Sequence, residues 1–375
     1  MRNTKIVCVT DTHFGARNDS LIFNEFFYDF YKNQFFPYII ENIDDICGIV
    51  HLGDCLDRRK FVNYKIAKDF REKFIGGLMD TWLPVHFIVG NHDIYYKNTL
   101  EVNCYKELRL PGEENGWYVH DTPSLANFQG YDIAMIPWIT AETYADTMNF
   151  IKNTSAQVAM GHLEIKGFEM HSGIMSDHGM EKTLFNNFDM VMSGHFHKRS
   201  SDGHINYLGC PYEMNWADSG DPKGFHTFDI TTRELEFIPN TRSMFYKVRY
   251  DDRTATDYLG MDLSEFEGKF VKVFVENRND YYAFDKFMDR MYKEISVTDL
   301  KVVEDFSDLS ADLVHDNVIE GAQDTLSLLD RYVEEIDTKL DKERIKSKLK
   351  SLYICLLYTS PSPRDLSTSR MPSSA

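Results

Sequence analysis

Five short apolar runs in this chain each end in a polar segment, and this repeated arrangement constrains the fold more than any other feature. The polar segments read DTHFG, GDCLDRR, GNHD, GHLE and GHFH. A glycine precedes the polar residue in four of them and closely follows it in the first. Glycine allows tight turns and a close backbone approach to a ligand. One such segment is a weak signal, but five that all offer oxygen or nitrogen ligands are hard to explain as ordinary surface loops.

The runs between these segments predict an α/β domain over residues 1–240. Patterns typical of strands lie at residues 5–10, 46–52, 85–89, 132–136, 157–161, 189–193 and 205–208, and helical patterns lie at 21–38, 64–79, 140–152 and 180–186. Strands that alternate with helices favour sheets covered by helices. Such sheets bind ligands beyond the carboxyl ends of their strands, which is where the polar segments fall.

The pattern changes after residue 240. The pattern of residues 241–306 predicts a small α+β module, and its sequence has no metal-ligating residues at the spacing of a motif. Residues 307–357 predict an acidic linker and then two amphipathic helices, whose apolar faces pack on their own domain or on a partner. Residues 358–375 are rich in Ser, Thr and Pro and predict a disordered tail. This tail looks like translated vector or adapter sequence, so we expect the natural C-terminus to be lost near residue 355.

Charge and targeting features narrow the class of protein. The net charge of −18 argues against nonspecific nucleic-acid binding, although bound divalent cations supply positive charge where a phosphate must sit. The N-terminus has no signal-peptide pattern, and no apolar run is long enough to span a membrane. The six cysteines are scattered without a C-x-x-C pair. We therefore expect a cytoplasmic protein with reduced thiols and no membrane contact.

The polar segments supply Asp, His and Asn as ligands, without Cys. This set suits Mn²⁺, Fe²⁺ or Zn²⁺. The number of ligands fits two ions roughly 3.5–4 Å apart that share a carboxylate. Such a pair of ions activates a water molecule and binds phosphate oxygens. The residues therefore predict a dinuclear centre for phosphoester hydrolysis.

Taken in order, the motifs resemble those of the calcineurin-like metallophosphoesterases, and within them the SbcD-type DNA repair exonucleases, including the recombination nuclease subunits of phages. The strings GNHD, IPW, GHLEIKGF, SGHFH, YLGCPY and DPKGF carry this resemblance, which is strong over residues 4–240 and looser beyond. It implies a metallophosphoesterase sandwich of two mixed β-sheets flanked by helices. It also implies that the small module caps the active site and helps to select DNA.

The resemblance further implies a role for each site residue. Asp11, His13 and His197 would bind the first metal ion, Asn91, His162 and His195 the second, and Asp54 would bridge both. His92 would stabilise the transition state without binding metal, and Asp57 is the candidate partner that orients it. His195 and His197 would thus serve different ions, with Phe196 turned into the core.

By the same resemblance, the protein would be a Mn²⁺-dependent nuclease acting on DNA ends in a bacterial cell or phage-infected host. Its activities would be 3′-to-5′ cleavage of duplexes and endonuclease cleavage of single strands. Its partners would be DNA, an SbcC-type SMC-like ATPase bound through the helix pair, and a second copy of the chain. The aromatic-rich residues 23–40 would form that dimer surface, or else belong to the core.

Two other functions compete with this interpretation. A phosphoprotein phosphatase or small phosphoester hydrolase has the same fold, and GDCLDRR resembles the GDxVDRG of such phosphatases. A non-catalytic scaffold would have lost ligands, whereas all seven expected positions are filled here.

A few neighbouring residues leave two interpretations open. His86 lies inside a strand-like run, which favours a structural role. Tyr207 and Tyr212 follow GHFH and either line the cleft or pack in the core. Arg58 and Arg59 either contact phosphate or begin a solvated helix.

Overall fold

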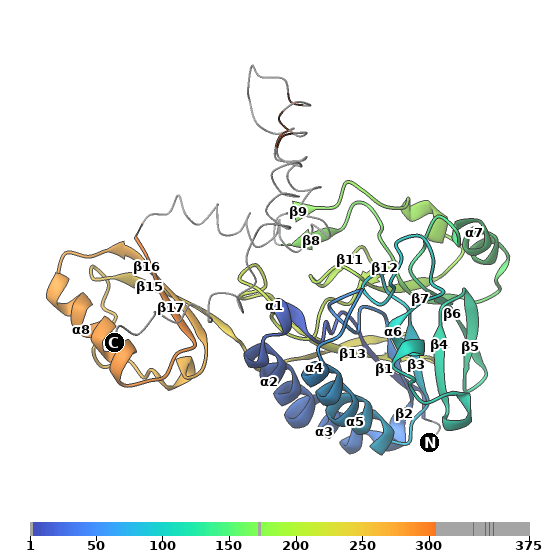
Figure 1. The fold of residues 1–375 in the computed structure, drawn as a ribbon, viewed down its shortest axis with the longest axis horizontal. Helices are drawn as coiled ribbons and strands as arrows, with labels where there is room; N and C mark the ends of the chain where they lie inside the picture. Colours follow the sequence, from blue (N-terminus) through green and yellow to red (C-terminus); the bar gives the residue numbers. More distant parts are fainter. Residues whose placement is uncertain are drawn as a thin grey trace, which may run out of the picture. The chain divides into compact units, whose positions relative to one another are not determined.

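Two six-stranded mixed sheets form the centre of the computed structural model, which describes residues 3–171 and 174–304 together with residues 333, 342, 345 and 348 (Figure 1). The predicted sandwich of two mixed sheets is therefore confirmed. The predicted linker and helix pair lie outside the described residues except at four positions, and the predicted tail lies wholly outside them.

The first sheet has the strand order β14-β13-β1-β2-β3-β4. Its four parallel strands are β1 (Lys5–Val9), β2 (Ile46–His51), β3 (Val85–Ile88) and β4 (Trp117–His120). The strands β13 (Gly224–Asp229) and β14 (Leu235–Pro239) add an antiparallel edge beside β1. Because β1, β2 and β3 are neighbours and parallel, the segments that follow them emerge at one edge of the sheet.

The second sheet has the order β11-β12-β10-β7-β6-β5. Its parallel strands are β12 (Ile205–Tyr207), β10 (Met190–Gly194), β7 (Val158–His162) and β6 (Tyr131–Ile136). Two strands pair antiparallel at its edges, β11 (Ser200–Ser201) and β5 (Ser124–Phe128). A separate short hairpin joins β8 (Glu169–His171) to β9 (Ile174–Met175).

Three apolar layers hold the sandwich together. The layer between the sheets includes Val50 and Ile88 of the first sheet and Met160 and Met192 of the second, all fully buried. Successive residues of each central strand face opposite layers, as expected for sheets covered on both sides. The outer face of the first sheet packs against helices, and the outer face of the second packs against α7 (Tyr144–Asn153).

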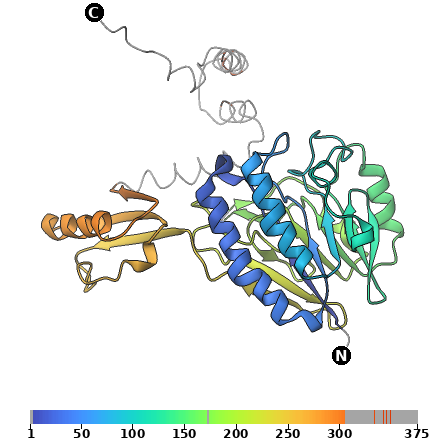
Figure 2. The same cartoon turned by 60° about the horizontal axis from the view of Figure 1, so that its bottom comes forward.

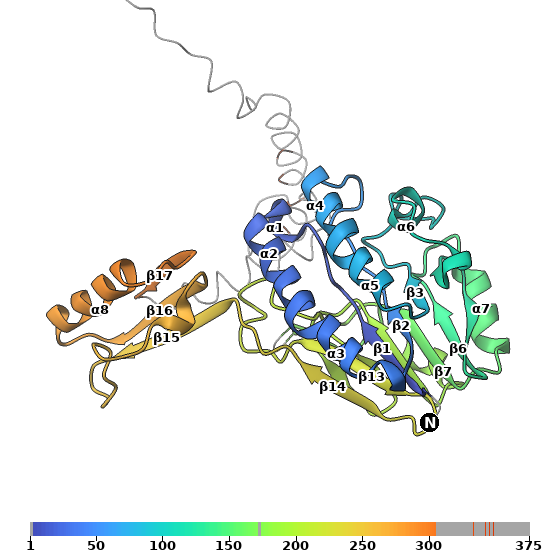
Figure 3. The same cartoon turned by 90° about the horizontal axis from the view of Figure 1, so that it is seen from below.

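Two long helical segments cover the first sheet (Figures 2 and 3). The first comprises α2 (Leu21–Phe30), a π-helical turn and α3 (Phe36–Glu41), and the second comprises α4 (Tyr64–Asp69), a π-helical turn and α5 (Gly76–Asp80). Short helices occur as α1 (Ala16–Asp19) and α6 (Cys104–Glu107). The aromatic-rich residues 23–40 pack largely in the core, so the core interpretation of that segment is the one the structure supports.

The small module has the predicted α+β composition. Its parallel strands are β15 (Phe245–Asp251), β16 (Phe270–Asn277) and β17 (Asp299–Val303), and α8 (Tyr281–Lys293) packs on them through Phe284 and Phe287. Its core is a separate apolar cluster.

Local sequence patterns missed some elements. The helix expected at residues 180–186 is only a 3₁₀ turn at Lys182–Phe185, because a single apolar side chain of that turn, Phe185, is buried. The strands β4, β5, β13 and β14 were not expected, and two of them, β5 and β14, are only partly buried. No helix among the described residues is long and apolar enough to cross a membrane.

Candidate metal centre

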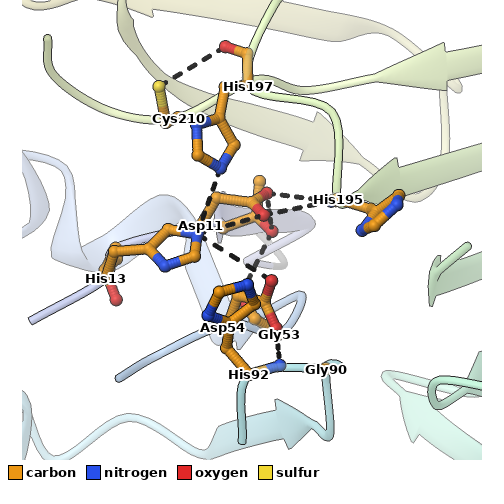
Figure 4. Close-up of polar contacts among 12 residues, drawn as sticks. Asp11, His13, Gly53, Asp54, Gly90, His92, His195, His197 and Cys210 are labelled. Carbon is orange, nitrogen blue, oxygen red and sulfur yellow. Dashed lines mark hydrogen bonds and ion pairs between the residues drawn. The ribbon is translucent and has the colours of Figure 1, made fainter. Parts of the chain in front are cut away.

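The five polar segments meet at one place, at the carboxyl ends of strands from both sheets. Figure 4 labels residues of DTHFG, GDCLDRR, GNHD and GHFH. Those of the first sheet carry Asp11 and His13 after β1, Asp54 after β2, and Asn91 and His92 after β3. Those of the second carry His162 as the last residue of β7, and His195 and His197 after β10. The structure therefore brings together every residue for which the sequence predicts metal binding.

Four of these residues have a left-handed backbone conformation that is uncommon outside glycine. The φ angles are 51° at Asp11, 41° at His13, 55° at Asp54 and 91° at His195. Each such residue costs of order 1–3 kcal/mol, and the surrounding structure must hold it in place. Here main-chain hydrogen bonds do so, from Asp11 N to the carbonyl of Gly53 (3.0 Å) and from His13 N to the carbonyl of Asp54 (3.1 Å).

One group of ligand atoms consists of Asp11, His13 and His197, which lie within 4.8 Å of one another. The rings of His13 and His197 point toward each other, with their Nε2 atoms 3.1 Å apart (Figure 4). Two nitrogens that each lie about 2.0–2.1 Å from one ion are separated by about 3–3.4 Å, so this spacing suits a shared ion. The carboxylate of Asp11 also accepts from the main-chain N–H of His195 (3.0 Å).

The second group consists of Asp54, His162 and His195, again within 4.8 Å of one another. The amide oxygen of Asn91 lies 3.0 Å from Nε2 of His162 and 3.0 Å from Nδ1 of His195. Nδ1 of His162 lies 2.7 Å from the carbonyl of Leu52 and must donate to it. That hydrogen bond fixes the tautomer and leaves the Nε2 lone pair of His162 available to a metal ion.

Asp54 belongs to the second group and also approaches the first. Its Oδ2 atom is 3.2 Å from Nε2 of His162 and 3.8 Å from Nε2 of His13. Its Oδ1 atom accepts from the main-chain N–H of His92 at 2.7 Å. One carboxylate thus touches both groups and fixes the loop that carries His92.

The carboxylates give the centre a strong preference for cations. Burial disfavours the charged form of His162, yet the charge and hydrogen bond of Asp54 and the charge of Asp11 raise its pKa to about 9. Burial acts likewise on His13, where Asp57, Asp54 and Asp11 raise the pKa to about 9. Burial opposes ionisation of Asp54, but neighbouring histidines hold its pKa well below the usual range. The field that attracts protons to these rings also attracts divalent ions.

These donors fit two borderline divalent ions. The set combines carboxylate and amide oxygens with imidazole nitrogens and contains no thiolate. Asp11, Asp54 and His162 are almost fully buried, so water cannot replace their mutual contacts. Buried carboxylates clustered with imidazoles are stable when they coordinate a metal.

The predicted partnership between Asp57 and His92 takes a different form from the one expected. Nδ1 of His92 lies 2.6 Å from the main-chain carbonyl of Asp57, and the carbonyl must accept that hydrogen bond. The Asp57 carboxylate lies 3.4 Å from Nδ1 of His13. Asp57 holds His92 through its backbone, with a hydrogen bond that does not depend on side-chain type, while its carboxylate approaches Nδ1 of His13 and lies within 4.8 Å of a ring nitrogen of His92.

Two residues that organise the site had no role assigned from the sequence. The carboxylate of Asp93 accepts from the main-chain N–H groups of Gly90 (2.8 Å), Asp54 (2.9 Å) and Cys55 (2.8 Å). It therefore ties the loop after β3 to the loop after β2. Its position directly after GNH was the only signal in the sequence.

The second is Lys223, within the string DPKGF. Its Nζ donates to the carbonyl of His197 (3.0 Å) and to the carboxylate of Asp218 (2.6 Å), and both Lys223 and Asp218 are buried. A buried charged pair of this kind holds the backbone of His197 in place. The carbonyl that it supports lies 26 residues earlier in the chain, which is why no local pattern reveals this contact.

Two glycines permit the close approach of these loops. A Cβ at Gly90 would lie 2.3 Å from Oδ1 of Asp54, and a Cβ at Gly194 would lie 2.0 Å from Oγ1 of Thr10. No side chain fits at either position without moving a neighbour. The glycines that precede Asn91 and His195 therefore allow the close backbone approach that the sequence pattern predicts.

Four other residues that the sequence predicts to pack in the core, or for which it leaves that choice open, are all buried. Phe196 is buried in the core of the second sheet, as expected. Tyr207 and Tyr212 are also buried, which favours the packing interpretation for both. His86 is buried and hydrogen-bonds His120 (3.0 Å), in agreement with a structural role.

Comparisons with known proteins support the predicted family. Residues 4–199 match the family described as Calcineurin-like phosphoesterase. The chain is 30% identical over 356 residues to Exonuclease subunit 1 of Enterobacteria phage T4, a match that covers 93% of this chain and 98% of that protein. It is 30% identical over 98 residues to a subunit of the SbcCD nuclease of Staphylococcus saprophyticus, covering 24% of this chain and 26% of that protein. It is 28% identical over 213 residues to DNA double-strand break repair protein Mre11 of Sulfurisphaera tokodaii, covering 53% and 50%.

Proposed function

This chain belongs to the calcineurin-like phosphoesterase family and is a hydrolase of phosphoesters, and we propose that it is a nuclease subunit that processes DNA ends in recombination and repair. The observation that carries the proposal is the length of the match to the phage exonuclease subunit. The family match ends at residue 199, whereas the match to that relative covers 93% of this chain. A phosphatase that shared only the catalytic domain with this chain would not match it over so much of its length.

The proposed roles of the residues follow the two groups. Asp11, His13 and His197 would hold one divalent ion, and Asn91, His162 and His195 the other, with Asp54 shared. When bound, two such ions supply a water of lowered pKa and positive charge for the phosphate oxygens. Mn²⁺ is the proposed ion, as the resemblance to the SbcD-type nucleases implies, and the ligand set without thiolate is compatible with Mn²⁺ as with Fe²⁺ and Zn²⁺.

His92 is the proposed catalytic residue that does not bind metal. Because its Nδ1 donates to the carbonyl of Asp57, Nε2 is the atom left to contact the scissile phosphate. When the ring is protonated, Nε2–H can donate to a phosphate oxygen or pass its proton to the leaving oxygen. Asp54 keeps the loop in place by accepting from the main-chain N–H of His92.

We further propose 3′-to-5′ exonuclease action on duplexes, endonuclease action on single strands, and assembly with an SMC-like ATPase and a second copy of the chain. The small module would cap the active site and help to select DNA. Residues 324–357 are the proposed docking element for the ATPase.

The test compares substrates side by side. Purified protein with Mn²⁺ is incubated with linear duplex DNA, single-stranded DNA, p-nitrophenyl phosphate and a phosphopeptide. We expect cleavage of both DNAs, abolished by EDTA and restored by Mn²⁺. Brisk hydrolysis of the phosphopeptide or p-nitrophenyl phosphate with intact duplex DNA would replace the nuclease proposal with the phosphatase alternative.

The partner proposal needs its own test. A variant that ends at residue 323 should still cleave short DNA with Mn²⁺ but should no longer bind the ATPase subunit in a pull-down. Undiminished binding would contradict the docking element, and loss of cleavage would show that this segment serves the catalytic domain.

A further inference from the structure

Two loops next to His92 expose aromatic side chains to solvent. Phe61 is 59% exposed, and Tyr95 and Tyr96 are 42% and 51% exposed. The rings of Tyr95 and Tyr96 contact each other edge to face, with centroids 4.7 Å apart. Water contact with several large aromatic rings is unfavourable, and clustered exposed rings indicate a binding surface.

Hydrogen bonds join both loops to the metal centre. The loop that carries Phe61 follows Asp57, whose carbonyl accepts from Nδ1 of His92 at 2.6 Å. In the same loop, Nε of Arg59 donates to the carbonyl of Ile94 at 3.1 Å, directly before Tyr95. Tyr95 N in turn donates to the carbonyl of Val102 at 2.9 Å. These contacts link the start of the Phe61 loop and the backbone of Tyr95 to the segment that carries His92.

The sequence of one of these loops is basic, in contrast to that of the whole chain. Residues 58–65 read RRKFVNYK, with four cationic residues and no acidic one, in a chain with 59 acidic and 41 basic residues. Arg58 pairs with Asp19 and lies over the ring of Phe61 at 4.7 Å, and Lys65 pairs with Asp69 at 2.7 Å. Lys60 and Lys97 are exposed, and neither forms a hydrogen bond or ion pair with another residue in the described part of the chain. Local positive charge beside aromatic rings suits a polyanion that also has flat apolar faces.

We propose that Phe61, Tyr95 and Tyr96 form an aromatic platform on which unpaired bases of a nucleic-acid strand stack, with Lys60 and Lys97 contacting the phosphates. This inference rests on the proposed nuclease function and names its substrate class as an unpaired strand or a frayed end. Stacking on aromatic rings tolerates any base sequence, because every base has a flat π-face. In an intact duplex those faces are covered by neighbouring base pairs, so the platform selects unpaired nucleotides.

The test measures binding of a fluorescein-labelled oligothymidine by anisotropy in EDTA, with wild-type protein and a Tyr95→Leu/Tyr96→Leu variant. Leucine keeps apolar bulk and removes the ring. We expect binding to weaken about tenfold or more, given the measured contribution of one stacked base. The control is Tyr131→Leu, because Tyr131 is similarly exposed (39%) but begins β6, whose start lies at the opposite end of the sheet from the site. This control should bind as wild type.

A second probe separates stacking from phosphate contact. An abasic strand of equal length should bind the wild type and the double variant equally, since it has no bases to stack. The Lys60→Gln/Lys97→Gln variant should bind both the oligothymidine and the abasic strand more weakly than wild type does. Melting temperature and Mn²⁺ content, measured on every variant, should match wild type, and Phe61→Leu supplies an independent variant if the double one is unstable.

The outcomes distinguish the platform from the function on which it rests. If wild type cleaves DNA but the tyrosine variant binds oligothymidine as tightly, the platform is wrong and the nuclease proposal stands. Equal loss of binding to the abasic strand also overturns stacking. If wild type hydrolyses p-nitrophenyl phosphate but neither binds nor cleaves DNA, the nuclease function fails, and the platform fails with it.

Discussion

The loops of the metal centre and the small module of residues 245–303 are built on opposite principles. The loops place four non-glycine residues at positive φ and bury carboxylates at Asp11 and Asp54. In the described residues of the module, no non-glycine residue has a positive φ, and its core is an apolar cluster, although Lys272 of β16 is also buried. Strain and buried charge persist only where other contacts over-determine them. The difference shows which part of the chain gives up stability for chemistry and which part is simply packed.

The largest expected effect comes from replacing the shared carboxylate by Asp54→Asn. The amide keeps the shape but removes the charge that both groups of ligand atoms use, so bound Mn²⁺ and hydrolysis should both fall to background. Mn²⁺ content by mass spectrometry and cleavage of linear duplex DNA check this. Retention of two ions would mean that Asp54 does not connect the groups.

The His92→Ala variant separates metal binding from catalysis. We expect cleavage of DNA to fall by about 10²–10⁴-fold, the usual contribution of an acid or base group. Mn²⁺ content should stay near that of wild type, because the structure links the side chain of His92 to the carbonyl of Asp57. Loss of an ion from this variant would contradict the proposed role.

Gly90→Ala tests whether the close approach of the loops matters. The new Cβ would lie 2.3 Å from Oδ1 of Asp54, so the carboxylate must shift. We expect hydrolysis to fall roughly 10–100-fold, as for other losses of support around a metal site. Gly268→Ala in the module is the matched control. Gly268 has φ 70°, and a Cβ added there would meet nothing within 4 Å, so its substitution should cost stability alone.

Lys223→Met should have a smaller effect that is confined to one side of the centre. The change removes the donor to the carbonyl of His197 and leaves Asp218 buried without its cation. We expect Mn²⁺ affinity to fall about tenfold at one of two sites in a calorimetric titration. Lys223→Arg should recover part of the affinity. Equal weakening of both sites would indicate general destabilisation instead.

The smallest effect on catalytic activity is expected from a substitution in the core of the module. Phe287 is fully buried in the module core, so Phe287→Ala should lower the stability of that module by about 3–5 kcal/mol. Hydrolysis of bis(p-nitrophenyl) phosphate, a small phosphodiester, should remain close to wild type, because this cluster is separate from those of the sandwich. A fall of more than tenfold would show that the module supports the metal centre directly and would break the comparison.

Much of the catalytic domain is visible in the sequence because the relevant signals are local. Apolar runs predict β1, β2, β3, β7 and β10, and the polar residues follow those runs within a few positions. The parallel order of the sheets then places them at one edge. Strands with weaker alternation, such as β5 and β14, escape prediction because their burial depends on neighbours far along the chain.

The grouping of the ligands depends on the packing of the two sheets. His195 and His197 are two positions apart, yet their nitrogens contact Asn91 and His13 respectively, more than 100 residues earlier in the chain. Only the approach of one sheet to the other brings these side chains together.

The hydrogen bonds that hold the site residues in place likewise depend on the fold. Local patterns in the sequence establish which residue types stand at the strand ends. They do not establish that Asp57 meets His92 through its carbonyl, that Asp93 joins two loops, or that Lys223 holds the backbone of His197. Hydrogen bonds need positions within about 3 Å, and between distant segments the three-dimensional fold sets those positions.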